Sequence, residues 1–95
     1  MIVSIKLKDF HVHKSYRGIF IDASGIVTVD EPNTTARLKI NKSPNHAINL
    51  EITDASLFFK GMSNEQRREC AIDIKRQIRM QINDVLKKEM ERLFV

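Results

Sequence analysis

The stretch DIKRQIRMQI, residues 73–82, decides how this chain folds. Ile74, Ile78 and Ile82 recur every four residues, so they fall on one side of an α-helix. Lysine and arginine residues stand between these isoleucines. The stretch is therefore typical of two structures: a helix that packs on a core with its charges in water, and a helix that binds nucleic acid.

A long C-terminal helix is predicted around this stretch, over residues 63–94. Gly61 interrupts the preceding segment, and Ser63 followed by Gln66 is a capping-box pattern that begins a helix. At about 100° per residue, the apolar side chains gather in a sector roughly 120° wide, which is the width of a core-facing stripe. These side chains are Ala71, Ile74, Ile78, Ile82, Val85, Leu86 and Leu93.

Residues 1–60 alternate between apolar and polar side chains, which is typical of strands with one buried face. The pattern predicts about five strands, and Gly25 with the two residues before it is expected to form a hairpin connection between two of them. The segment LFF is expected to be an apolar plug or a short sixth strand. The predicted strands lie within residues 3–8, 16–22, 25–29, 35–41 and 47–53.

These elements predict an α+β fold in which an antiparallel β-meander is followed by the amphipathic helix, packed on one face of the sheet. With 95 residues, the chain is expected to be a single domain, 1–95, with the sheet in residues 1–60 and the helix in residues 63–94. A helix of about 30 residues is roughly 45 Å long. Strands of six residues reach only about 20 Å, so part of the helix should extend past the sheet, bend, or pack on another subunit.

The apolar end of this helix is predicted to bury against a second copy of the chain, as a homo-oligomer and most simply a dimer. The alternative is a frayed C-terminus in a monomer. The predicted oligomer interface consists of Leu86, Met90, Leu93 and Phe94.

The charge of the chain is compatible with nucleic acid or an acidic protein as a partner, because 16 Lys+Arg stand against 12 Asp+Glu, a net charge of +4. No apolar run reaches the roughly 18 residues of a membrane span. The N-terminal stretch does not resemble a signal peptide, and Cys70 is the single cysteine. We therefore expect a cytoplasmic protein with no membrane partner.

Basic residues around exposed aromatic rings are typical of platforms for single-stranded nucleic acid. Lysines and arginines of the strands are predicted to point to the outer face of the sheet, joined by Tyr16 and Phe20 if Ile19 and Ile21 point inward. Other basic residues share one flank of the helix. The predicted nucleic-acid-binding residues are Lys6, Lys8, Tyr16, Phe20, Arg37, Lys39, Lys75, Arg76 and Arg79.

The basic flank of the helix has a second interpretation, as an ordinary solvated surface. Asp73 stands three residues before Arg76, and Asp84 stands four residues before Lys88. Oppositely charged residues at these spacings stabilise a helix that faces water.

Metal binding and catalysis are not predicted. His11 and His13 lie on the same side of an extended segment, but a metal site needs three or four ligands and no further ligand stands at a matching spacing. Cys70 is expected to be a structural thiol. The sequence has no G-x-S-x-G, no phosphate-binding loop and no paired-carboxylate motif. We therefore predict no cofactor, no metal and no catalytic residue.

The sequence thus predicts a small non-enzymatic protein that binds a macromolecule through protein–protein contacts, as an adaptor, an inhibitor or an assembly component. The alternative is a single-stranded nucleic-acid-binding module that uses the basic outer face of the sheet and the basic flank of the helix.

Overall fold

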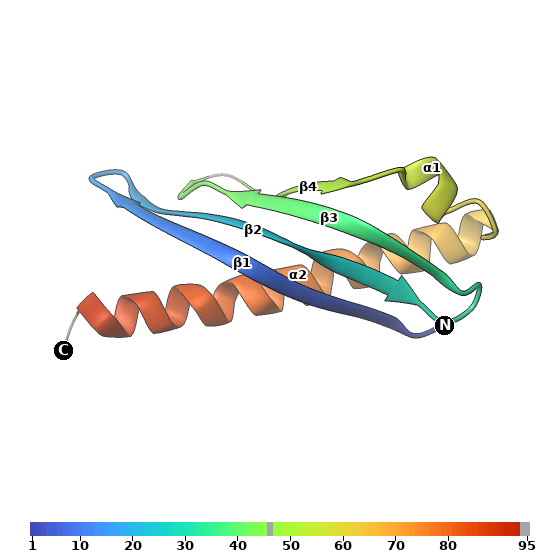
Figure 1. The fold of residues 1–95 in the computed structure, drawn as a ribbon. Coiled ribbons are helices and arrows are strands. Elements are labelled where there is room, and N and C mark those ends of the chain that lie inside the picture. The colour runs from blue at the N-terminus through green and yellow to red at the C-terminus, as the bar shows by residue number, and fades with distance from the viewer. Residues whose placement is uncertain (46, 94–95) are drawn as a thin grey trace.

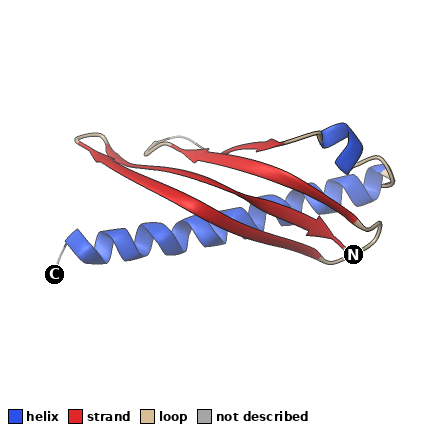
Figure 2. Ribbon diagram, in the orientation of Figure 1, coloured by secondary structure: helices blue, strands red, loops and turns tan. Residues whose placement is uncertain are grey.

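A computed structural model describes residues 1–45 and 47–93 as an antiparallel sheet followed by a short and a long helix (Figure 1). The elements are β1 (Val3–Ser15), β2 (Gly18–Val29), β3 (Thr34–Lys42), β4 (Asn49–Ile52), α1 (Ala55–Phe58) and α2 (Asn64–Leu93). Each strand pairs with the next along the chain, in the order β1-β2-β3-β4. The α+β class, the antiparallel meander and the long C-terminal helix are confirmed, with four strands rather than about five (Figure 2).

The predicted connection at residues 23–25 is wrong, because these residues form the middle of β2. A Cβ atom on Gly25 would lie 2.2 Å from the backbone oxygen of Lys6, so β1 passes too close for any side chain. Glycine is needed here for the close approach of two strands rather than for a change of direction. The chain reverses instead at Tyr16 and Arg17, ahead of Gly18, whose φ of 128° favours glycine.

A β-bulge carries β1 past the end of the predicted first strand. The pairing of β1 with β2 shifts between Lys8 and His11, and Asp9 takes up a left-handed φ of 54°. Two residues of β1 therefore face one residue of β2, and the alternation of side chains moves by one position. As a result Val12 packs against the same core as the apolar residues before the bulge.

Helix α2 packs on one face of the sheet, along β1 and β2 (Figure 1). Its capping box is formed as predicted: the Ser63 N–H donates to Gln66 Oε1 at 2.9 Å, and the Gln66 N–H donates to Ser63 Oγ at 3.2 Å. The isoleucines of the DIKRQIRMQI stretch are core residues, each at most 1% exposed. They meet inward-facing side chains of the strands, which include Val3, Ile5, Ile21, Ala23, Val27, Val29, Ala36, Leu38 and Ile40.

Two glutamines of α2 cap the outer edge of β1. Gln77 Nε2 donates to the backbone oxygen of Val3 at 2.6 Å, and Gln81 Nε2 donates to that of Ile5 at 3.1 Å. An edge strand carries backbone groups that would otherwise attract another strand. The glutamines satisfy two of these groups and fix the helix alongside β1.

The β1–β2 hairpin is much longer than the six-residue strands that we expected. Its strands have 13 and 12 residues and span about 40 Å, which nearly matches the roughly 45 Å of α2. Strands β3 and β4 have only 9 and 4 residues. The helix therefore extends past β3 and β4, while the hairpin still runs beside it.

The variant Ile78→Ala should lower the free energy of unfolding by about 2–5 kcal/mol, because it leaves a cavity in the core. Ile72→Ala is the matched control, since Ile72 lies on the same helix but is 62% exposed. Its effect should stay within about 0.5 kcal/mol. Urea denaturation of both variants measures the difference, and equal losses would contradict this core.

Candidate binding surfaces

Four cations of the strands gather on the outer face of the sheet, which is the face opposite α2. The register places Lys6 and Arg37 on either side of Ile26, and places the other two on either side of Ser24. All four side chains are exposed, and the members of each pair lie about 10 Å apart, since a single strand separates them. We call this group the basic cluster: Lys6, Lys8, Arg37 and Lys39.

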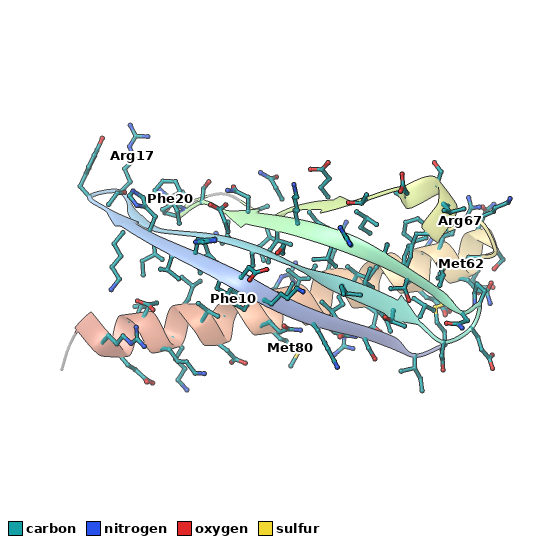
Figure 3. All side chains as sticks on the ribbon, in the orientation of Figure 1. Phe10, Arg17, Phe20, Met62, Arg67 and Met80 are labelled. Atoms are coloured by element: carbon teal, nitrogen blue, oxygen red, sulfur yellow. The ribbon has the colours of Figure 1, made fainter. Side chains whose placement is uncertain are left out.

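The two predicted aromatic residues lie at the turn end of the β1–β2 hairpin, where Figure 3 labels Phe20. Phe20 is on the outer face, where its ring centroid lies 6.1 Å from that of His13. Tyr16 is 93% exposed in the hairpin turn, and the guanidinium of Arg17 lies 5.5 Å from the centre of its ring. We call Tyr16 and Phe20 together the aromatic tip.

Carboxylate and amide side chains separate the aromatic tip from the basic cluster. Asn41 Nδ2 donates to Asp22 Oδ1 at 2.5 Å, and Ser24 Oγ donates to Asp9 Oδ2 at 3.3 Å. These four residues line a shallow depression of the outer face, and Glu51 lines it with them. Because carboxylates repel phosphates, the outer face is not one continuous platform of cations and rings.

The basic residues of α2 lie on the other side of the sheet from the basic cluster. Arg76 forms an ion pair with Asp73, to which its Nε also donates at 3.1 Å. Lys75 and Arg79 are exposed and line a groove between α2 and β4. Within the described part of the chain, the predicted nucleic-acid-binding residues are therefore distributed over several surfaces.

This groove, which we call the side groove, was not predicted. Its floor is apolar and its rim is cationic, and no carboxylate is among the described residues that line it. Two of the residues that line it, Ala47 and Ile48, precede β4, which covers only Asn49–Ile52, whereas the alternating pattern predicted a strand over residues 47–53. The lining residues are Lys42, Ala47, Ile48, Leu50, Lys75, Ile78, Arg79 and Asn83.

The predicted oligomer interface continues the same flank of α2 toward its C-terminal end. Leu86 and Met90 follow Arg79 by seven and eleven residues, spacings that return to nearly the same side of a helix. Leu86 is half-buried against the core, and Met90 is 52% exposed. The side chain of Leu93 and the whole of Phe94 lie outside the described residues.

His11 and His13 are both exposed on the outer face. Within residues 1–45 and 47–93, no three His, Cys, Asp or Glu side chains gather closely enough to hold a metal ion. In the same ranges, no helix combines the length and the apolar character needed to cross a membrane.

Cys70 is completely buried in the first part of α2. Burial raises the pKa of its thiol, and the negative charge of Asp73 raises it further. The thiolate is the reactive form of cysteine. The Cys70 thiol therefore stays protonated at neutral pH and serves as part of the core.

The Cys70 thiol should react with a thiol reagent orders of magnitude more slowly in the native protein than in urea. Stability should also fall as the pH rises through the ordinary thiol pKa, because the unfolded thiol then loses its proton while the folded one keeps it. Urea denaturation at neutral and alkaline pH measures this effect. Cys70→Ala should reduce the loss of stability at alkaline pH, and an identical loss in this variant would contradict the assignment.

The described residues thus present three separate surfaces: the basic cluster, the aromatic tip and the side groove. Cations, exposed rings and apolar floors are all features of binding surfaces. Compared with known proteins, the chain matches no protein-family model, no curated protein and no solved structure.

Proposed function

We propose that this chain is a non-enzymatic protein-binding module of the cytoplasm, an adaptor, inhibitor or assembly component, that works as a homo-oligomer. The observation that carries the proposal is the uncovered side of the C-terminal part of α2. The last pair between β2 and β3 is Ile21 with Lys42, and β2 continues beyond it to the hairpin turn. The helix there faces two strands only.

Apolar side chains on this uncovered side support a partner surface. Ile19 and Leu86 are half-buried beside the hairpin, and Met90 follows one helical turn after Leu86 at 52% exposure. Burying a large apolar side chain is worth about 1.5–3 kcal/mol. A dimer with two-fold symmetry would bury the same patch from both copies, so each of these gains would count twice.

The variant Met90→Glu should shift the protein toward the monomer, because a carboxylate would be buried in an apolar interface. Met80→Glu is the matched control. Met80 is 57% exposed on the same helix and points away from the sheet (Figure 3). Light scattering at a series of concentrations measures the mass of each variant. A monomeric native chain at every concentration would contradict the proposal, as would equal dissociation of the two variants.

Binding of single-stranded nucleic acid by the basic cluster is the second candidate function. It is favoured by the register of β1, β2 and β3, which brings four cations together around the exposed Ile26. Lysine and arginine bind phosphates through charge, and this binding weakens with salt. The carboxylates beyond the cluster would restrict the contact to a short stretch of nucleotides.

A labelled thymidine oligonucleotide should then bind with a slope of about −3 in the plot of log affinity against log salt, as expected for about four phosphates on a single strand. Arg37→Glu should weaken this binding. Lys87→Glu, which changes an exposed cation of α2 by the same charge, should affect it much less. Absence of binding at low salt, measured by fluorescence anisotropy, would exclude this second candidate.

A further inference from the structure

The two edges of the sheet differ in whether their outward backbone groups have hydrogen-bond partners. At the β1 edge, the glutamines of α2 donate to the backbone oxygens of Val3 and Ile5. At the β4 edge, no further strand of the described residues lies beside the sheet (Figure 1). The β4 edge is therefore more open to another strand than the part of β1 that the glutamines cover.

The direction of the backbone groups at this edge follows from the pairing with β3. The Thr53 N–H donates to the backbone oxygen of Arg37 at 2.9 Å, and Glu51 is paired with Lys39. Backbone groups of successive residues alternate between the two sides of an antiparallel strand. Those of Leu50 and Ile52 therefore point away from β3, where no hydrogen bond within the described part of the chain engages them.

The side groove runs along this same edge, because Leu50 lines it. Ile48 and Ile78 extend its apolar floor, and Lys75 and Arg79 stand on the wall formed by α2. Neither of these two cations forms an ion pair with a described residue. The edge thus combines open backbone groups, an apolar floor and uncompensated positive charge.

We propose that the β4 edge and the side groove bind an extended acidic peptide segment, which joins the sheet as a strand beside β4. Strand addition supplies backbone hydrogen bonds, and the side chains at alternate positions supply specificity. Glutamates at every second position would place their methylene groups on Leu50 and their carboxylates near Lys75 and Arg79. The intervening side chains would lie beside Glu51 on the outer face, so neutral residues fit there.

The chemistry of the edge favours this peptide over the other occupants. A second copy of the chain that paired through β4 would bring its own Lys75 and Arg79 to the same edge, and like charges placed together oppose association. A nucleic acid would satisfy the cations, but its sugar–phosphate backbone cannot continue the ladder of peptide hydrogen bonds. The proposed surface is distinct from Met90 and does not depend on self-association.

A blocked peptide of alternating glutamate and valine, titrated into the isotopically labelled full chain, tests the proposal. The backbone amide signals of Leu50 and Ile52 should shift most and exchange more slowly with solvent. The same peptide with lysine in place of glutamate should not bind. N-methylation of the peptide amides that face β4 should weaken binding about tenfold or more, through lost hydrogen bonds, without any change to the protein.

Matched charge-reversal variants test whether the cations of the side groove contribute to peptide binding. Arg79→Glu should weaken peptide binding about tenfold or more, whereas Lys87→Glu on the same helix should change it less than about twofold. Met90→Glu should bind the peptide as the native chain does, so this result is separate from loss of self-association. The proposal is overturned if the N-methylated peptide binds equally well, if the shifts map to the basic cluster, or if a thymidine oligonucleotide displaces the peptide from Leu50.

Discussion

The packing of one helical row, Cys70, Ile74, Ile78 and Ile82, against the inner face of the sheet is the contact on which the rest of the structure depends. Because this row is essentially inaccessible to water, α2 has a single orientation about its own axis. That orientation turns Gln77 and Gln81 toward β1. It also turns the opposite flank, with Lys75 and Arg79, toward β4. The rotation of the helix about its axis thus determines which of its side chains stand beside each edge of the sheet.

The sheet separates two groups of cations that have different surroundings. The basic cluster lies on the outer face beside carboxylates such as Asp9 and Asp22, whereas Lys75 and Arg79 lie beside aliphatic side chains. Charges in water are screened within about 10 Å at ordinary ionic strength. Charges beside an apolar surface are screened less and interact more strongly with a bound ion. A modest net charge therefore combines two groups of cations whose surroundings differ.

Sequence periodicity was sufficient to predict the helix, its capping box and the inward faces of most strands, because these features depend on neighbours within a few residues. The number of strands was not predictable in this way. The residues around Gly25 fit a turn as well as a strand. The contact of Gly25 with Lys6, which is remote in sequence, places it in a strand. The bulge had a visible signal, since apolar residues move from the odd positions, such as Leu7, to the even position of Val12.

The candidate surfaces were predictable only in part, for the same reason. The exposure of the basic residues followed from alternation. Which of them meet depends on the register between strands and on the side that α2 covers, and neither is a local property. The side groove lies where the chain enters β4, beside Ile48 and Leu50, and it needs α2 to bring Lys75 and Arg79 to the same place.

The glutamine caps on β1 also bear on whether copies of this chain can polymerise. A sheet with two open edges can pair head to tail without limit, since the last strand of one copy joins the first strand of the next, and such growth leads to fibres. Here the backbone oxygens of Val3 and Ile5 are already engaged by Gln77 and Gln81. A strand that arrived at this part of β1 would first have to displace the two glutamine side chains. The helix that builds the core therefore also makes this part of the β1 edge less open to another strand.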